Sequence, residues 1–289
     1  MAPVLETPSK NSLPWTGIAW FGALLLAVYA PVLKNMIRQW NNDPDLGHAF
    51  FVPAIAAYIV WQDRNELSEM KAEPNLWGLL VMGWGAIQLV LATLGTELFT
   101  ARMSFVVTLI GVVWTLGGTR MLRKLAFPLF LLFFMLPIPV VIYSAATFKL
   151  QILASQLADA ALTLLSVPVL REGNVLELPN QKLSVVDACS GIRSLLSLTF
   201  LSLVYGYFFE RKTWIRIVLF LSTIPIAIIA NASRVTMTGI MTQIRADLAE
   251  GFFHEAEGWV IFMVALVILI VFHQLLIRGM RLLEARRSR

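Results

Sequence analysis

The chain has 289 residues, of which 58% are hydrophobic and only 14% are charged. A soluble domain is typically about 45–50% apolar and about 25% charged, so this composition excludes an ordinary soluble protein and indicates one that crosses a membrane several times. The net charge of +5 does not indicate nucleic-acid binding, because the basic residues lie at the edges of apolar runs, where they report membrane topology.

Apolar runs and polar loops predict an all-α polytopic membrane protein with about eight transmembrane helices, a periplasmic interfacial helix and a short β-hairpin. Residues 1–14 are expected to form a polar N-terminal tail, residues 15–277 one transmembrane domain and residues 278–289 a basic tail. A spanning helix needs about 20 mostly apolar residues. The runs that meet or approach this length are 15–33, 49–61, 76–94, 103–118, 125–141, 192–209, 214–230 and 259–277.

The basic loops predict the orientation of these spans. Loop 120–124 holds three basic residues and no acids, loop 210–212 is net basic, and the tail after residue 277 holds five arginines and one glutamate. Cytoplasmic loops carry an excess of Lys and Arg, so both termini are expected in the cytoplasm. In a Gram-negative bacterium the outside is the periplasm, and the membrane is then the bacterial inner membrane. The loops expected on the periplasmic side are 34–48, 95–102, 142–191 and 231–258.

Residues 143–165 are long enough to span as well, but they carry polar side chains at roughly helical spacing. These are Lys149, Gln151, Gln156 and Asp159. Apolar residues fill the other side, which favours an amphipathic helix that lies in the membrane interface. A crossing here would also move Cys189 and loop 210–212 to the wrong sides of the membrane.

Cys189 is the sole cysteine of the chain and lies at the start of the apolar run 192–209. Residues 175–178 and 182–186, joined by a Pro-Asn-Gln turn, predict a β-hairpin that leads to it. A single cysteine excludes an internal disulfide and a multi-cysteine metal site. Cys189 is then either a small buried packing residue or a thiol nucleophile.

Two further residues are predicted at the same outer membrane edge as Cys189. Arg234 follows the run 214–230, and His254 precedes the run 259–277. A helix N-terminus and a nearby imidazole both favour a thiolate, so Cys189 and His254 can attack a peptide carbonyl and protonate the leaving amine. Arg234 can stabilise the oxyanion with a permanent positive charge. Taken alone, His254 is equally an ordinary interfacial histidine, and Arg234 an arginine that snorkels from a helix end.

Neighbouring residues carry secondary expectations. Gly191 would let a substrate backbone approach closely. Arg193 is a cation near a helix N-terminus, which the helix dipole disfavours, so it pairs either with a substrate carboxylate or with an acid of the chain. His48 and His273 are expected to be structural, and Glu255 either orients the histidine before it or is solvated. The chain lacks the second histidine of an HExxH zinc helix, and neither a metal nor a cofactor is expected.

The motifs around these residues resemble those of the exosortase/archaeosortase family of membrane transpeptidases. Ala188-Cys189-Ser190-Gly191-Ile192-Arg193 is similar to the family's cysteine motif, Asn231-Ala232-Ser233-Arg234 to its arginine motif, and Phe253-His254 with Gly258-Trp259 to its histidine motif. Gly47-His48 followed by Val52-Pro53 resembles a family element that comes after the first span. The resemblance covers roughly residues 15–277.

The resemblance implies an activity and roles for the site residues. Exosortases process secreted proteins with a C-terminal signal, which consists of a Pro-Glu-Pro-like motif, a transmembrane helix and a basic cluster. They cleave near the motif and transfer the new C-terminus to an acceptor molecule, whose identity is unknown here. By resemblance Cys189 is the nucleophile, His254 the general acid/base, and Arg234 the oxyanion or substrate stabiliser, at the periplasmic face and in contact with membrane lipid. Arg193 or Arg234 is expected to pair with the motif's glutamate, and an equal loss in Arg193→Ala for Glu and Gln substrates would exclude this for Arg193.

Two other classes of protein stay open. An intramembrane cysteine protease that only hydrolyses would share the thioester step and need no acceptor, so the mass of the product separates the two. A non-enzymatic transporter or scaffold for envelope polymers usually carries its polar residues near the middle of the membrane, and here they gather at the outer edge. Retained function in Cys189→Ala would support this last class.

Overall fold

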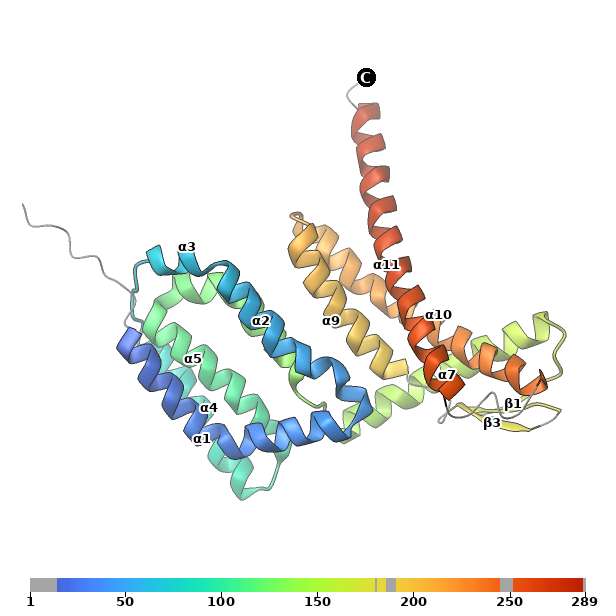
Figure 1. Ribbon diagram of the computed structural model, residues 1–289, viewed down its shortest axis with the longest axis horizontal. Helices are drawn as coiled ribbons and strands as arrows, with labels where there is room; N and C mark the ends of the chain where they lie inside the picture. The colour runs from blue at the N-terminus through green and yellow to red at the C-terminus, as the bar shows by residue number, and fades with distance from the viewer. Residues whose placement is uncertain (1–14, 180, 186–190, 245–251, 288–289) are drawn as a thin grey trace, which may run out of the picture. The chain divides into compact units, whose positions relative to one another are not determined.

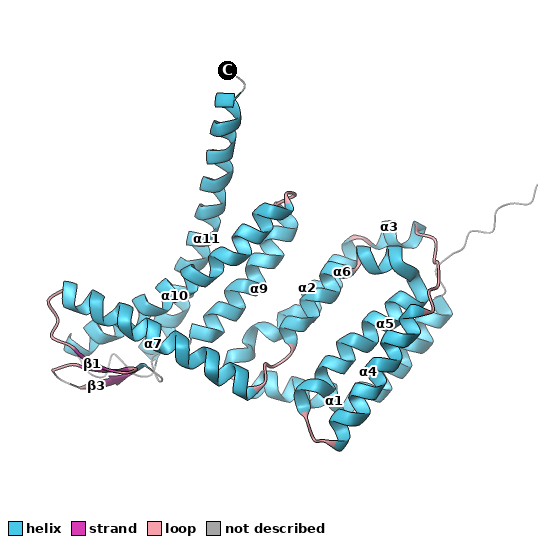
Figure 2. Cartoon of the chain, turned by 180° about the vertical axis from the view of Figure 1, so that it is seen from behind, coloured by secondary structure: helices cyan, strands magenta, loops and turns pink. Residues whose placement is uncertain are grey.

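The computed structural model describes residues 15–179, 181–185, 191–244 and 252–287. Over this part the chain is helical apart from a small antiparallel sheet, which confirms the predicted all-α class with a short β element (Figures 1 and 2). Seven of the described helices are long and apolar enough to cross a membrane, so the chain is a multi-pass membrane protein. It divides into two compact units, Met1–Pro139 and Val140–Arg289.

The first unit is built around the long helices α1 (Trp15–Asn42), α4 (Trp77–Leu94) and α5 (Leu98–Lys124). Helices α4 and α5 are antiparallel and approach closely at glycines. A Cβ atom on Gly111 would lie 2.6 Å from the backbone nitrogen of Met82, and one on Gly85 would lie 3.0 Å from that of Thr108. Small residues at such contacts let helices pack tightly in lipid, where the hydrophobic effect does not drive them together.

Six of the eight predicted spans correspond to long helices, and the runs 49–61 and 125–141 do not. The elements that replace them are the 3₁₀ helix η1 (Pro44–Phe50), α2 (Phe51–Gln62), α3 (Arg64–Glu69), α6 (Ala126–Leu131) and the 3₁₀ helix η2 (Leu132–Met135). The 12 residues of α2 make a helix about 18 Å long, which is shorter than the ~30 Å hydrocarbon core. After η2, Pro137 and Pro139 prevent a continuous helix, because proline has no N–H to donate and disfavours the helical conformation of the residue before it. Neither of these two runs therefore forms one continuous helix that is long enough to cross the membrane.

Polar contacts hold these broken segments in place within the first unit. Lys124, the last residue of α5, lies with its Nζ 3.1 Å from Asp63 Oδ2 and 2.7 Å from Glu66 Oε2. The indole N–H of Trp40 in α1 donates to the Met135 carbonyl of η2 at 3.0 Å. The end of α2 is thus tied to the end of α5, and η2 is tied to α1.

The second unit holds α7 (Val140–Leu164), β1 (Leu170–Glu172), β2 (Val175–Glu177), β3 (Lys182–Ser184), α9 (Gly191–Phe209), α10 (Thr213–Ile244) and α11 (Phe252–Arg287). The strands form one antiparallel sheet in the order β1-β2-β3, with Leu176 opposite both Arg171 and Leu183. The predicted hairpin is confirmed as β2 and β3, and the edge strand β1 was not predicted. Helix α11 starts before the predicted last span and continues into the predicted basic tail.

Helix α7 corresponds to the segment that was expected at the membrane interface, and it is long and apolar enough to cross a membrane. Two of its four predicted polar residues face the sheet: Gln151 accepts from the Asn174 amide at 3.4 Å, and Asp159 lies 3.9 Å from Arg171. The polar stripe therefore serves in part to hold β1 and its turn. Figure 1 shows α7 at a steep angle to α11, and its position at the interface stays a prediction.

A buried polar cluster joins the end of α9 to α11. The ring of His273 lies between Tyr205 and Glu210, with Nδ1 2.9 Å from the Tyr205 hydroxyl and Nε2 3.2 Å from Glu210 Oε2. A carboxylate only accepts hydrogen bonds, so Nε2 donates to Glu210, and in the neutral ring Nδ1 then accepts from the Tyr205 hydroxyl. Glu210 also accepts from the backbone N–H groups of Arg211 and Lys212 at the start of the α9–α10 connection, at 2.7 and 2.8 Å. These contacts agree with the structural role predicted for His273.

We expect Glu210→Gln to destabilise the fold in a pH-dependent way. Burial alone would raise the pKa of the Glu210 carboxyl, but hydrogen bonds from the Lys212 N–H, the His273 ring and the Arg211 N–H lower this pKa below its usual value. The carboxylate then stabilises the fold above the unfolded-state pKa of about 4.3, and this stabilisation is lost as the pH falls through the lower folded-state pKa. Hydrogen bonds to a charged group contribute about 1.5–3 kcal/mol. Thermal unfolding in detergent should therefore show a Tm deficit at neutral pH that shrinks as the pH falls through the lowered folded-state pKa.

The matched control for this experiment is Glu284→Gln. Glu284 is 70% exposed and lies 3.7 Å from Lys212, and an exposed ion pair contributes little. It should leave Tm nearly unchanged at every pH. A deficit in Glu210→Gln that is equally large at neutral and acidic pH would contradict the role given to the carboxylate charge.

Candidate active site

Helix α10 carries Arg234 and extends further than predicted. It runs from Thr213 to Ile244 without a break, whereas the prediction ended the span at residue 230 and placed Arg234 in the following loop. The hydroxyls beyond residue 230 do not break the helix, because those of Thr236 and Thr238 donate to carbonyls of the preceding turn at 2.9 and 3.0 Å. Its 32 residues make about 48 Å of helix, more than the ~30 Å hydrocarbon core. Arg234 is therefore held by a helix and not by a loop.

The half of α10 that contains Arg234 is anchored in the core of the second unit. Val235, the next residue, is fully buried against the apolar sides of α7 and the sheet. The core cluster consists of Ala154, Ala158, Leu162, Leu176, Leu178, Leu183, Val185 and Val235. This packing fixes the rotation of α10, and Arg234, which lies about 100° around the helix from Val235, faces α11.

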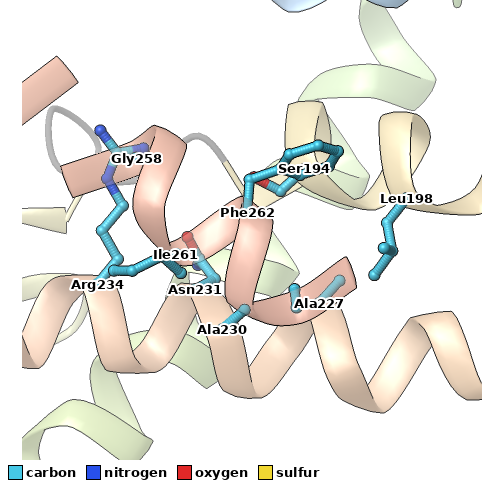
Figure 3. A pocket seen from close by; sticks show the side chains of 10 residues that line it. Ser194, Leu198, Ala227, Ala230, Asn231, Arg234, Gly258, Ile261 and Phe262 are labelled. Carbon is cyan, nitrogen blue, oxygen red and sulfur yellow. The ribbon is translucent and has the colours of Figure 1, made fainter. Parts of the chain in front are cut away.

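Arg234 itself is buried, with 8% of its surface exposed. Its guanidinium lies against Gly258 of α11 (Figure 3). A Cβ atom built on Gly258 would lie 3.2 Å from Arg234 Cζ, 3.3 Å from Nη2 and 3.4 Å from Nη1. The charged group of Arg234 is therefore in contact with the backbone of the helix that carries His254.

A small cavity lies beside this contact, between α9, α10 and α11. It is lined by Ser194, Leu198, Ala227, Ala230, Asn231, Arg234, Gly258, Ile261, Phe262 and Ala265. Figure 3 shows Arg234 and Asn231 extending from α10 toward α11, with Ser194 on α9 across the cavity. Its volume of about 10 Å³ is close to the space one water molecule needs. The polar groups at the cavity are thus a hydroxyl, an amide and a guanidinium in an otherwise apolar wall.

The structure describes the helices around the predicted catalytic residues, but it does not describe all of these residues. Cys189 lies outside the described residues; helix α9 begins at Gly191, two positions later. His254 belongs to the first turn of α11, and its side chain lies outside the description. Residues four apart on a helix share a face, so His254 is one turn before Gly258 on the same side of α11. The first turn of α9, the Arg234 turn of α10 and the start of α11 therefore meet at one cavity.

Among the cavity residues that were not predicted to belong to the site are Ser194, Asn231 and Gly258. Asn231 is buried, with 6% of its surface exposed, and lies one turn before Arg234 on α10. Its spacing of three residues from Arg234 would have indicated a shared face if the helix had been predicted to continue. Gly258 was recognised only as part of a motif, because its contact with Arg234 exists only in the folded chain.

The other predicted residues have the following places. Arg193 is half-buried in the first turn of α9. His48 lies in η1 of the first unit, where burial lowers its pKa against the opposing effect of hydrogen bonds with the backbone of Phe134 and Asp45. The side chain of Glu255 lies outside the description. Among the described residues, no three His, Cys, Asp or Glu side chains gather in a way that could hold a metal ion.

Comparison with known protein families gives a match that contains all three motifs. The model of the family described as transmembrane exosortase (Exosortase_EpsH) matches residues 40–271, which is well over half of the chain. No curated protein and no solved structure matches the chain. The matched region extends from the end of α1 into α11 and includes residues 189, 234 and 254, and we conclude that the chain belongs to the transmembrane exosortase family.

Proposed function

We propose that this protein is a membrane cysteine transpeptidase that cleaves the C-terminal sorting signal of secreted proteins and transfers them to an envelope or extracellular acceptor. Membership in the exosortase family implies a sortase-like transpeptidase and suggests sorting-signal proteins as substrates. In this proposal Cys189 is the nucleophile, His254 the general acid/base and Arg234 the stabiliser of negative charge. Arg193 and Gly191, next to the cysteine, contact the substrate.

The reaction follows from these roles. The Cys189 thiolate attacks the scissile carbonyl carbon, a C–S bond forms, and the carbonyl oxygen becomes an oxyanion that Arg234 stabilises. The C–N bond then breaks, and protonated His254 gives its proton to the leaving amine. An acceptor nucleophile attacks the thioester, gives a proton to His254, and releases Cys189 as a thiolate. Water in place of the acceptor would make the same enzyme a hydrolase.

The buried position of Arg234 is the observation that carries this proposal. A guanidinium does not lose its charge, so Arg234 keeps a positive charge at this buried place at every pH of interest. Arg234 is 8% exposed and contacts α11 one turn from His254, at a cavity that the first turn of α9 also lines. Arg234 thus places a permanent positive charge between α9, which follows Cys189, and α11, which carries His254. Such a charge can stabilise both a thiolate and an oxyanion.

The transmembrane helix of the substrate would bring the cleavage motif to an active site at the membrane edge. If the active site faces the periplasm of a bacterial inner membrane and both termini are cytoplasmic, a substrate helix beside the enzyme places its cleavage motif near Cys189. The basic cluster after that helix stays in the cytoplasm. Membrane lipid surrounds both chains.

The intact mass of a co-expressed substrate tests the proposal. The substrate carries a Pro-Glu-Pro-like motif, a transmembrane helix and a basic cluster, and it is isolated from cells with and without the enzyme. We expect truncation near the motif only with the enzyme, and an added group on the new C-terminus. Truncation with the mass of water alone would identify a hydrolase, and an intact, membrane-inserted substrate in both cells would favour the non-enzymatic class.

A further inference from the structure

We infer that Gly258 is a positioning residue, whose missing side chain seats the Arg234 guanidinium against α11 one helical turn from His254. This inference rests on the function proposed above, because the seat matters only if Arg234 stabilises the reacting group. It assigns a role to a residue that touches Arg234 and that neither needs to touch the substrate nor takes part in proton transfer.

The geometry of the contact carries the inference. The three atoms nearest to a Cβ on Gly258 are Arg234 Cζ, Nη2 and Nη1, at 3.2, 3.3 and 3.4 Å. Because these three distances are nearly equal, the guanidinium presents its plane, and not one edge, to the α11 backbone. A Cβ atom at residue 258 would make this contact too tight, and the guanidinium would have to move away by a few tenths of an ångström.

Gly258 differs from the glycines that pack one helix against another. At Gly85 and Gly111 a Cβ would lie close to the backbone of a neighbouring helix, so those glycines serve helix packing. At Gly258 the nearest atoms all belong to the end of one flexible side chain. Alanine at residue 258 can therefore be accommodated by a shift of the guanidinium, with the helices left in place.

Gly258→Ala is therefore expected to lower activity without lowering thermal stability. Alanine favours a helix over glycine, so Gly258→Ala should not lower the thermal stability. The same change should displace the guanidinium of Arg234 from its position beside the reacting atoms. The shift that an alanine requires is a few tenths of an ångström, which is smaller than the ~1 Å misplacement that can cost on the order of 100-fold in rate. We therefore expect a loss of about 10-fold in kcat with a smaller change in KM.

A double-mutant cycle tests the inference. Single-turnover cleavage and thermal unfolding are measured for Gly258→Ala in the wild-type, Arg234→Lys and Arg234→Ala backgrounds. Gly279→Ala is the matched control, since it lies on the same helix and has no atom within 4 Å of an added Cβ. If the role of Gly258 is to seat the guanidinium, its substitution costs activity in the wild type and less than about threefold where lysine or alanine replaces Arg234.

The outcomes separate this inference from the proposed function. An equal loss of activity from Gly258→Ala in all backgrounds, or a fall in Tm that accompanies the loss, would show that Gly258 does not act by positioning Arg234. The transpeptidase proposal would still stand. A fully active Gly258→Ala beside an impaired Arg234→Ala would lead to the same two conclusions. Full activity of Arg234→Ala would instead remove the proposed role of Arg234, and the seat with it. If Arg234→Ala cleaves too slowly to measure, the Arg234→Lys background decides.

Discussion

Replacing Cys189 by alanine is expected to abolish cleavage of the sorting signal. The chain has one cysteine, so no other thiol can form the thioester, and alanine fills the position without adding a charge or a polar group. Removal of the nucleophile from a well-organised hydrolase site costs on the order of 10⁶-fold in kcat. The substrate should therefore accumulate uncut, while binding of the substrate is retained because the thiol is used only in the chemical step.

The single cysteine also provides a control that most proteins lack. Iodoacetamide should inactivate the wild type and label it once, and it should leave Cys189→Ala unlabelled. The neighbouring Ser190→Ala serves as the matched substitution and should cleave at close to the wild-type rate. Cleavage that persists in Cys189→Ala, measured by intact mass under single-turnover conditions, would exclude the thiol mechanism.

Most of the long helices could be predicted because a membrane span appears in the sequence as one continuous run of apolar residues of sufficient length. The two runs that do not form one long helix have different causes. Pro137 and Pro139 interrupt the run 125–141, and the run 49–61 is simply too short, with its helix α2 ending at Gln62. A run of apolar residues predicts burial in lipid more securely than it predicts an unbroken helix.

Tertiary partners explain what the sequence could not predict in the second unit. The spacing of Gln151 and Asp159 on α7 indicated a water-facing stripe, but their partners are Asn174 and Arg171 of β1 and its turn. Strand β1 has only three residues, which is too short to show an alternating pattern. Contacts between segments far apart in the chain decide both features.

The sequence predicts which residues form the candidate site, but it does not predict the contacts that the structure shows around Arg234. Cys189, Arg234 and His254 each lie next to an end of an apolar run, and the predicted topology places these three ends on the same side of the membrane, which is the basis for predicting a common site. The prediction still ended α10 too early, because Asn231, Ser233 and Arg234 looked like the start of a loop, whereas polar residues continue a helix when their groups find partners in it. The contact between Arg234 and Gly258 could not be predicted, since it depends on the rotation of two helices.

The second large effect is expected at Arg234. Arg234→Ala should lower kcat/KM by about 10²- to 10³-fold, the usual loss when one oxyanion donor is removed. Arg234→Lys should recover only a small part, because a lysine ammonium is a point charge without the planar fork that lies against Gly258. Ser233→Ala is the matched control, since Ser233 is the preceding residue of α10 and is exposed.

Whether kcat or KM changes in the Arg234 variants shows which role Arg234 has. A fall in kcat with KM nearly constant means that the guanidinium acts on the transition state, as an oxyanion stabiliser does, whereas a rise in KM with kcat unchanged means that it binds the substrate equally before and during the reaction. Thermal unfolding must accompany the kinetics, because Arg234 is buried and its loss leaves a void beside Asn231 and Gly258. A folded Arg234→Lys enzyme at close to the wild-type rate would contradict the prediction, because a positive charge alone would then be sufficient and the orientation imposed by α11 would have no catalytic value.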